Sequence, residues 1–436
     1  MSKNHRMDIR ALYEHFKNSG IISTDTRKIT PGCIFFALKG DHFNGNEFAE
    51  KAIELGASLA VIDDVRFREV SKTFFVEDVL TALQDLARHH RSMLSIPVIG
   101  LTGSNGKTTS KELVHAVLSK KFRTQATTGN LNNHIGVPLT ILSIKPETEI
   151  AVIEMGANHV GEIALLSSIA NPTHGFITNI GKAHIGTFGG FENIIRGKTE
   201  LYQHLINSNG TVFVNSQNPI LSPMIRRFTD VVLYPAVNDF IHVEPVGTDP
   251  GLVVRADGGR EISSHLTGVY NFENIAVALC IGKYFGVSAE EAAKAVEAYV
   301  PSNMRSQMIH TGTNRIILDA YNANPSSMEA AILNLRSMPG DKKIAIVGDM
   351  YELGDDAESE HLNIGILLKD SAFSEVYLCG MLMSKAKETC PEAKTFDNRE
   401  ALLAYLYFNK PANSTILIKA SRGMGLEKLM EVFQTA

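Results

Sequence analysis

The stretch Ile96–Ser110 constrains this chain more than any other part of the sequence. It begins with the apolar run Ile96–Leu101, typical of a buried strand, and an apolar helical pattern follows over Leu113–Leu118. The glycine-rich loop between them carries a lysine and two threonines. A strand, such a loop and a helix form a cradle for phosphate, because glycines let backbone N–H groups approach the anion closely. The predicted nucleotide contacts in this loop are Gly103, Ser104, Asn105, Gly106, Lys107, Thr108 and Thr109.

Two kinds of side chain in the loop have separate expected roles. Lys107 is placed to reach the β- and γ-phosphates, and Thr108 or Thr109 can offer a hydroxyl to Mg²⁺. The loop reads Gly-x-x-Gly-Lys-Thr, because Leu101 stands where the longer eight-residue pattern has its first glycine. An ordinary glycine-rich turn is the alternative, but a strand, loop, lysine and helix rarely coincide by chance.

Length and composition indicate a globular enzyme of several domains. The chain has 436 residues, with 44% hydrophobic and 20% charged residues. Its net charge of −5 creates no field that attracts nucleic acid, and no segment is apolar enough for a membrane span. The four cysteines form no C-x-x-C pair, so neither a disulfide framework nor a zinc site is predicted. The polar N-terminus lacks an apolar region behind it, so we expect a cytoplasmic location.

Residues 1–80 form the first expected domain, a small α/β unit. Its loops are punctuated by glycine and carry hydroxyl, guanidinium and amide groups at Thr26, Arg27, Asn44 and Asn46. This chemistry suits a nucleotide diphosphate. From the residues alone, ordinary turns are an equally good interpretation.

The central domain is expected over residues 81–311 and contains the phosphate loop. Glu154 ends the apolar strand Glu149–Glu154, where a carboxylate beside such a loop would hold Mg²⁺. A solvated acid is the alternative. His184 follows the next strand and can ligate a second cation, although a lone histidine is more often structural. Amides for a polar ligand, or alternatively Asx turns, are predicted at Asn130, Asn132 and Asn133.

Two further features of the central domain have more than one interpretation. Lys198 lies on a predicted helix, Glu192–Leu205, and taken alone is a solvated charge. Asn271 and Asn274 lie three residues apart at the start of a long apolar helix, on one face of it. Amides there can read a base edge, and helix capping is the alternative for Asn271.

Residues 312–436 are expected to form a third, doubly wound domain that begins after Arg305. Strands and helices alternate regularly from Arg315–Asp319 to Leu426–Phe433. Ligands of such sheets bind at the carboxyl ends of the strands, so three loops should face one crevice: Asp319–Pro325, Gly348–Met350 and Ser421–Gly423. The predicted fold class is therefore α/β with three domains.

Taken together, these motifs resemble the Mur ligases of peptidoglycan synthesis over nearly the whole chain. Thr102–Thr109 is similar to the family's T-G-x-N-G-K-T loop, and Glu154–Ala157 and Ala183-His184 are similar to its metal-side motifs. The members that add D-alanyl-D-alanine are the ones this chain resembles most. Their motifs G-N-x-N-N-x-I-G-V-P-x-T, D-x-Y-N-A-N and G-D-M-x-E-L-G correspond to Gly129–Thr140, Asp319–Asn324 and Gly348–Gly354.

The resemblance implies ATP-dependent amide formation with Mg²⁺ in peptidoglycan precursor synthesis. The terminal carboxylate of UDP-N-acetylmuramoyl-tripeptide would become an acyl phosphate, and the amine of D-Ala-D-Ala would then displace phosphate. It implies a small UDP-binding unit, a central P-loop ATPase-like domain and a C-terminal Rossmann-like domain, and we expect a monomer. A sister ligase that adds an earlier stem amino acid and a folylpolyglutamate synthetase-like ligase are the alternatives, together with a nucleotide-dependent switch.

The resemblance also implies a role for individual residues. Lys107, His184 and Lys198 would be catalytic, with Lys198 carbamylated beside a second Mg²⁺. Further metal ligands would be Thr108 and Glu154. Asn271 and Asn274 would approach adenine, while Arg305 and Asp319 would reach ATP from the domain junction, Asp319 at the ribose. The implied substrate-binding residues are Thr26, Arg27, Asn44 and Asn46 for UDP, with Asn130, Asn132, Asn133, Asn322 and Asn324.

Overall fold

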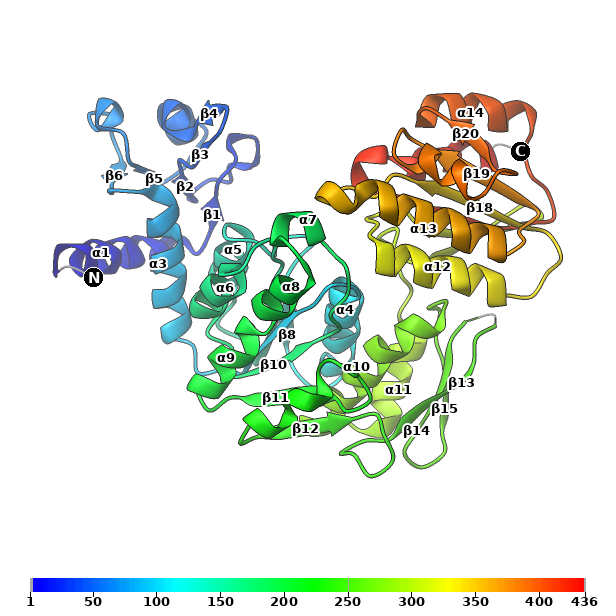
Figure 1. Cartoon of the computed structure of the whole chain (residues 1–436). Helices are drawn as coiled ribbons and strands as arrows, with labels where there is room; N and C mark the ends of the chain where they lie inside the picture. The colour runs from blue at the N-terminus through cyan, green and yellow to red at the C-terminus, as the bar shows by residue number, and fades with distance from the viewer. Residues whose placement is uncertain (1–2, 250, 435–436) are drawn as a thin grey trace.

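The computed structural model describes residues 3–249 and 251–434, which form three lobes in chain order (Figure 1). Each lobe is built on a mainly parallel sheet with helices packed against it. The predicted α/β class with three domains is confirmed. Every helix within the described ranges falls short of the length and apolarity that a membrane crossing requires.

The N-terminal lobe is a four-stranded parallel sheet in the order β1-β2-β5-β6, with a small hairpin, β3-β4, at its side. The two inner strands, β2 and β5, carry apolar side chains that are buried on both faces. Its elements are α1 (Lys3–Ser19), β1 (Ile22–Ser23), β2 (Ile34–Phe36), β3 (Lys39–Gly40), β4 (Phe43–Asn44), α2 (Ala49–Glu54), β5 (Leu59–Ile62) and β6 (Thr73–Phe75).

Helix α3 (Val79–Ser92) joins the N-terminal lobe to the central lobe. The carboxylate of Asp78 caps it by accepting the N–H of Thr81 at 2.6 Å. The helix packs against α1 and also against α5 and α6 of the central lobe. At its far end the buried Arg91 donates to the carbonyls of Ala170 and Asn171 at 2.9 and 3.0 Å. The predicted boundary at residue 80 thus falls inside a helix that contacts both lobes.

The central lobe is a six-stranded parallel sheet in the order β12-β11-β10-β7-β9-β8. Strand β7 lies between β10 and β9, so the loop after it emerges at the middle of the sheet's carboxyl edge. The elements of this sheet are β7 (Val98–Thr102), α4 (Lys107–Leu118), β8 (Thr124–Ala126), α5 (Gly136–Leu142), β9 (Ile150–Glu154), α6 (Glu162–Ala170), β10 (His174–Ile177), α7 (Ile185–Phe188), α8 (Phe191–Lys198), α9 (Glu200–Asn207), β11 (Thr211–Asn215) and β12 (Val231–Tyr234).

A three-stranded antiparallel sheet, β13-β14-β15, and two helices complete the central lobe. The sequence predicts an antiparallel patch over residues 231–267, but its first strand, β12, pairs in parallel with β11 instead. The prediction for that strand is wrong because pairing partners cannot be recognised from local composition. The remaining elements are β13 (Val243–Gly247), β14 (Val253–Ala256), β15 (Glu261–Ser263), α10 (Phe272–Tyr284) and α11 (Ala289–Ala298).

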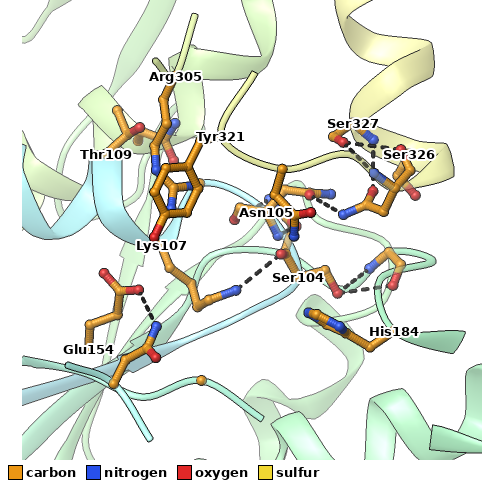
Figure 2. Close-up of a pocket in the computed structure, with 18 of the residues that line it drawn as sticks. Ser104, Asn105, Lys107, Thr109, Glu154, His184, Arg305, Tyr321, Ser326 and Ser327 are labelled. Carbon is orange, nitrogen blue, oxygen red and sulfur yellow. Dashed lines mark hydrogen bonds between the residues drawn. The ribbon is translucent and has the colours of Figure 1, made fainter. Parts of the chain in front are cut away.

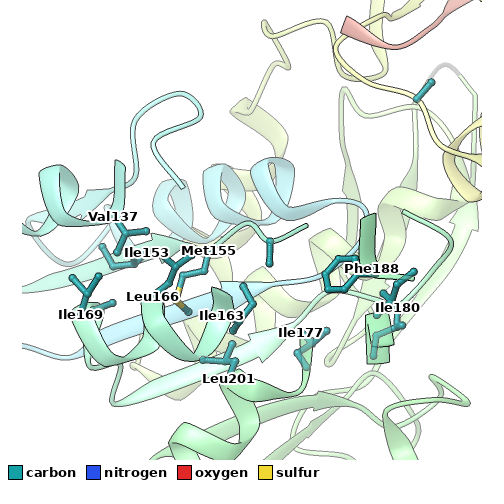
Figure 3. Close-up of a cluster of buried hydrophobic side chains, with 14 of the residues drawn as sticks. Val137, Ile153, Met155, Ile163, Leu166, Ile169, Ile177, Ile180, Phe188 and Leu201 are labelled. Atoms are coloured by element: carbon teal, nitrogen blue, oxygen red, sulfur yellow. The ribbon is translucent and has the colours of Figure 1, made fainter. Parts of the chain in front are cut away.

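Buried apolar side chains pack between β9 and α6, next to the end of β9 (Figure 3). Ile153 and Met155 are buried there against Ile163 and Leu166 of α6. Successive side chains of a strand point to opposite faces, so Glu154 points away from this cluster.

The C-terminal lobe is a six-stranded sheet in the order β16-β17-β21-β18-β19-β20, parallel except for β16. Strand β16 begins at Gln307, before the predicted domain boundary at residue 312. The elements are β16 (Gln307–Thr311), β17 (Asn314–Asp319), α12 (Pro325–Ser337), β18 (Lys343–Gly348), α13 (Ala357–Asp370), β19 (Glu375–Cys379), β20 (Lys394–Phe396), α14 (Arg399–Phe408), β21 (Thr415–Lys419) and α15 (Met430–Gln434).

Candidate active site

A cavity of about 990 Å³ lies between the central and C-terminal lobes. Its walls come from the loop after β7, the end of β9, the loop after β10, the start of α10 and the loop after β17 (Figure 2). Of the residues predicted for nucleotide and metal, the lining includes Ser104, Asn105, Gly106, Lys107, Thr109, Glu154, His184, Asn271, Asn274, Arg305 and Asp319. The topology therefore gathers most of the predicted site at one place.

The loop between β7 and α4 has the backbone that its glycines allow. Gly103 and Gly106 have φ angles of +146° and +77°, which side chains disfavour. A Cβ atom on Gly103 would lie 2.0 Å from the hydroxyl of Thr178. That hydroxyl donates to the carbonyl of Asn105 at 2.6 Å, which fixes the loop against the neighbouring strand. The loop is thus a preformed turn at the start of a helix.

Lys107 folds back over this loop, and among the described residues no carboxylate lies within hydrogen-bond distance of its Nζ. Its Nζ donates to the carbonyls of Gly103 and Ser104 at 2.8 and 3.1 Å. Burial lowers the pKa of Lys107 to about 8, the Glu154 carboxylate partly offsets this shift, and the charge of Arg305 adds to it. An amine held by two carbonyls beside a cavity is poised to exchange them for phosphate oxygens.

Glu154 at the end of β9 is 1% exposed and only half satisfied. Its Oε1 accepts the Asn132 amide at 2.8 Å and the Thr108 hydroxyl at 3.3 Å. Its Oε2 is buried and has no hydrogen-bond partner. An unpartnered buried carboxylate oxygen is costly, so this atom requires a cation or water.

The donor set around Glu154 fits Mg²⁺. A carboxylate and a hydroxyl are hard oxygen donors, and Mg²⁺ takes one or two protein ligands with water and substrate phosphates. In the part of the chain that the structure describes, no three His, Cys, Asp or Glu residues converge as a complete metal cage. A metal held jointly by Glu154, Thr108 and a nucleotide stays a prediction, which the contact between these two side chains supports.

His184 faces the cavity, but its contact is with the C-terminal lobe. Its Nδ1 pairs with a carboxylate oxygen of Glu352, which holds the pKa of Glu352 below its usual value. Sequence reasoning missed this role of Glu352, although the residue lies within the quoted G-D-M-x-E-L-G motif. The role of His184 as a metal ligand stays a prediction.

Lys198 is fully buried at the end of α8, which rules out its interpretation as a solvated charge. Its Nζ donates to the carbonyl of Ala157 at 2.9 Å and lies 5.1 Å from the ring centre of Phe188. Burial, reinforced by the charge of Lys107, holds the pKa of Lys198 well below its usual value. The uncharged amine is the form that reacts with CO₂. Carbamylation itself stays a prediction.

Asn271 and Asn274 connect the start of α10 to α4, the helix that follows the phosphate loop. The Asn274 amide donates to Asn271 Oδ1 at 2.8 Å and accepts the hydroxyl of Ser110 at 2.8 Å. Asn271 in turn donates to the carbonyl of Thr267 at 2.7 Å and makes no capping bond to the helix. Both line the cavity, and contact with adenine stays a prediction.

The C-terminal lobe docks directly on the phosphate loop. The amide of Asn324 donates to Asn105 Oδ1 at 2.8 Å while its own oxygen caps α12. Beside it, the N–H of Lys182 donates to Ser326 Oγ at 3.0 Å and its Nζ pairs with Glu360 at 2.6 Å. The nucleotide loop therefore touches the lobe that the sequence expects to carry part of the substrate site.

Arg305 and Asp319 meet where the two lobes join. The guanidinium of Arg305 lies 3.9 Å from the ring centre of Tyr321, and its buried Nε has no hydrogen-bond partner. Asp319 pairs with the buried Lys419 at 2.6 Å. Sequence reasoning missed Lys419, although a lysine at the end of the apolar strand Thr415–Lys419 was an available signal.

The predicted substrate residues fall into two groups. Those of the first lobe lie outside the cavity: the side chain of Arg27 is 87% exposed and pairs with Asp25, while Asn46 is fully buried between Asn44 and Asp63. Thr26 precedes Arg27 in the same exposed turn. Those that line the cavity are Asn130, Asn132, Asn133, Asn322 and Asn324.

Comparisons with known proteins identify the family of this chain. Three sequence families match in order: "Mur ligase family, catalytic domain" over residues 19–91, "Mur ligase middle domain" over 101–282 and "Mur ligase, glutamate ligase domain" over 304–422. UDP-N-acetylmuramoyl-tripeptide–D-alanyl-D-alanine ligase of Bacillus subtilis is 36% identical, over 94% of this chain and 92% of the relative.

Solved structures give the same result for the fold. MurF from Acinetobacter baumannii superposes with a TM-score of 0.86 at 31% identity, covering 95% of this chain and 93% of that one. MurF ligase from Thermotoga maritima in complex with ADP superposes with a TM-score of 0.85 at 27% identity, covering 95% and 97%. With its three matched domains and a relative above one-third identity along nearly its whole length, this chain belongs to the Mur ligase family.

Proposed function

We propose that the chain is an ATP-dependent ligase that joins D-alanyl-D-alanine to UDP-N-acetylmuramoyl-tripeptide in peptidoglycan precursor synthesis. The observation that carries the proposal is the buried, unpartnered Glu154 Oε2 beside the Lys107 loop, at the junction of two lobes. The Bacillus subtilis relative bears the name of this activity, and the Thermotoga maritima relative was solved with ADP. The cytoplasmic location and the monomeric state stay predictions.

The chain's own groups account for the nucleotide half of the reaction. Thr108 and Glu154 would hold Mg²⁺, which when bound neutralises phosphate charge and orients the γ-phosphate. Lys107 would exchange its two carbonyl contacts for phosphate oxygens, and Arg305 would add a second positive charge. Phosphoryl transfer needs little covalent chemistry from a protein, so positioning and charge supply most of the catalysis.

The second half of the reaction needs the two reactants held together. The tripeptide carboxylate would become an acyl phosphate, and the D-Ala-D-Ala amine would attack it and release phosphate. Asn324 and Ser326 of the C-terminal lobe bond to Asn105 and Lys182 in two loops of the central lobe, and this contact supports alignment of the reactants at the junction. A reaction between two substrates gains its rate from such alignment.

The test is a reconstitution with the purified full chain, ATP and Mg²⁺. UDP-N-acetylmuramoyl-tripeptide and D-Ala-D-Ala together should yield phosphate and a product whose mass is the sum of both substrates minus water. Omitting the dipeptide should leave no such product, and D-Ala alone is the matched control. A product formed instead from a shorter UDP-peptide and a single amino acid would favour a sister ligase and overturn the proposal.

A further inference from the structure

The residues around Arg305 adopt an unusual backbone where the central lobe passes into the C-terminal lobe. Met304 and Ser306, on either side of Arg305, have φ angles of +57° and +50°. Neither is a glycine, so both are in a conformation that side chains disfavour. Such a conformation persists only where the surroundings impose it, and it is concentrated at functional sites. We call residues 304–306 the arginine arch.

Contacts from two elements impose this conformation on the arginine arch. The N–H of Ser306 donates to Asp319 Oδ1 at 3.1 Å, and the N–H of Tyr321 donates to the carbonyl of Met304 at 3.2 Å. From the short 3-10 turn just before α10, the Tyr270 hydroxyl lies 2.7 Å from Ser306 Oγ. The carboxylate of Asp319 is the one charged group among these contacts, and its orientation decides whether the Ser306 bond forms.

Lys419 fixes that orientation. It faces Asp319 across the parallel pair β17–β21, at the carboxyl end of both strands. Its side chain is 2% exposed, and its Nζ donates to Asp319 Oδ2 at 2.6 Å and to the carbonyl of Asn322 at 3.2 Å. With Oδ2 held by the ammonium, Oδ1 is left directed at the arch. The Asp319 side chain is 13% exposed, and its charge-assisted hydrogen bond to the buried ammonium favours this orientation of the carboxylate.

The arch in turn presents Arg305 to the cavity. The guanidinium packs on the ring of Tyr321, with 3.9 Å from its central carbon to the ring centre (Figure 2). Its buried Nε has no hydrogen-bond partner among the residues that the structure describes. A planar guanidinium with unused N–H groups suits a phosphate oxygen. The unmet hydrogen bond is consistent with a site arranged for an absent anion.

We propose that Lys419 is a positioning residue for Arg305, acting through Asp319 and the backbone of the arginine arch. The inference rests on the proposed function, because the anion that Arg305 meets is then a nucleotide phosphate. Lys419 also borders the cavity, but its Nζ is engaged by Asp319 and Asn322, and the proposed role is exerted through these contacts. A role confined to the stability of the sheet is the competing explanation.

A double-mutant cycle separates the two explanations. Lys419→Met keeps the length of the side chain and removes its charge, and Arg305→Ala removes the group that it is proposed to position. We expect each single variant to lower kcat of the ligase reaction on the order of 10-fold to 100-fold, since small misplacements cost that much. The double variant should be no slower than Arg305→Ala alone, because coupled residues are not additive.

Lys394→Met is the matched control. Lys394 lies on the same sheet, pairs with Glu375 at 3.3 Å and is 51% exposed, so its loss should leave kcat unchanged. Multiplicative effects of Lys419→Met and Arg305→Ala would overturn the proposal. So would a Lys419→Met variant that loses thermal stability while its kcat stays at the wild-type value.

Two further measurements keep the test decisive. If Lys419→Met does not fold, Lys419→Gln replaces it, because glutamine keeps a hydrogen-bond donor for Asp319 without the charge. If neither variant folds, Lys419 is required for the stability of the sheet, and the proposal is refuted. The same cycle measured as ATP affinity by calorimetry is independent of amide formation. A wild-type chain that binds ATP but forms no amide bond would overturn the proposed function, and the affinity cycle would still decide the role of Lys419.

Discussion

The polar loops of the N-terminal lobe and the walls of the interlobe cavity contain similar residues, but they differ in whether the polar side chains have partners within the protein. In the N-terminal lobe, Asn46 uses its amide within the protein, and Arg27 is paired with Asp25. In the cavity, Glu154 Oε2 and Arg305 Nε are buried without partners. Buried polar groups are nearly always satisfied, so these two atoms in the cavity wall are consistent with a ligand that supplies the missing bonds.

The comparison teaches that composition alone does not distinguish a binding loop from a structural one. Both regions combine asparagine, glycine and a cation, and both were predicted to bind a nucleotide group. What differs is whether the protein already satisfies those groups. The experiments below test this distinction, beginning with the largest expected effect.

Lys107→Ala should remove most turnover while leaving the fold intact. Losing one preorganised charge contact in a water-poor site costs on the order of 10²- to 10³-fold in kcat. Phosphate release in the reconstituted reaction measures it, with far-UV circular dichroism to confirm folding. Lys120→Ala, an exposed lysine just beyond the same helix, is the control. Near-wild-type turnover of folded Lys107→Ala would show that the cavity does not bind phosphate through this loop.

Glu154→Gln should lower kcat on the order of 10²-fold and raise the Mg²⁺ concentration needed for half-maximal rate. The amide keeps the size of the side chain, but it replaces one of two hard anionic oxygens with a donor. Activity measured against Mg²⁺ concentration gives the result. Glu149→Gln, just before the same strand and with a 43% exposed side chain, should behave as wild type. An unchanged Mg²⁺ dependence of Glu154→Gln would show that Glu154 is not a ligand of the metal.

Lys198→Ala should lose on the order of 10-fold to 100-fold in activity, and short carboxylic acids should restore part of it. The expectation follows from the family resemblance and from the buried amine, whose pKa is held well below its usual value. Added acid would supply the oxygens that a carbamate provides. The same acids should not restore Lys107→Ala. Full activity of Lys198→Ala without any acid would exclude a carbamate.

In the N-terminal lobe, substitutions should affect stability and substrate binding separately. Asn46→Ala leaves partners of a buried amide unsatisfied, so the free energy of unfolding should fall by about 1–3 kcal/mol. Arg27→Ala removes only an exposed ion pair with Asp25, so it should lower the free energy of unfolding far less than Asn46→Ala, and its main effect should be a higher KM for the UDP substrate. Urea unfolding and steady-state kinetics measure both, with the exposed Asn18→Ala as control. An unaltered KM in Arg27→Ala would remove that residue from the substrate site.

The smallest effect concerns Asp25, whose pKa the hydrogen bond from Arg27 lowers from 3.8 to about 2. The stability that this pair contributes is present above pH 3.8 and is lost as the pH falls through about 2. A bound diphosphate would compete for the guanidinium and raise the pKa of Asp25 toward 3.8. NMR titration of the Asp25 carboxyl with and without the UDP substrate measures this. An identical pKa in both would place the diphosphate elsewhere.

The local parts of the site could be predicted from the sequence. The fifteen residues around Lys107 are enough to predict a strand, a turn and a helix, and Glu154 lies at the end of a clear apolar run. The alternation of strands and helices also predicted the C-terminal lobe. In each case, the signal lies within one element and follows from periodicity or backbone requirements.

Contacts between distant segments could not be predicted. His184 and Glu352 are 168 positions apart, and Asp319 and Lys419 are 100 positions apart. The first contact depends on how two lobes dock and the second on strand order, and neither is written in a local pattern. The state of Asn46 was hidden for the same reason, because its partner Asp63 comes from the end of another strand.

Helix α3 has a consequence for how such chains can be recombined. Because it packs on both the N-terminal and the central lobes, the seam between them runs through a continuous helix and has no flexible linker. In a chimaera of two related ligases joined at residue 80, the first turn of α3 would come from one protein and the rest of the helix from the other. Side chains in the cores of both the N-terminal and the central lobes would then not match. Exchange of the substrate-recognising lobe between related ligases is therefore expected to succeed only when α3 moves with its anchor residue Arg91.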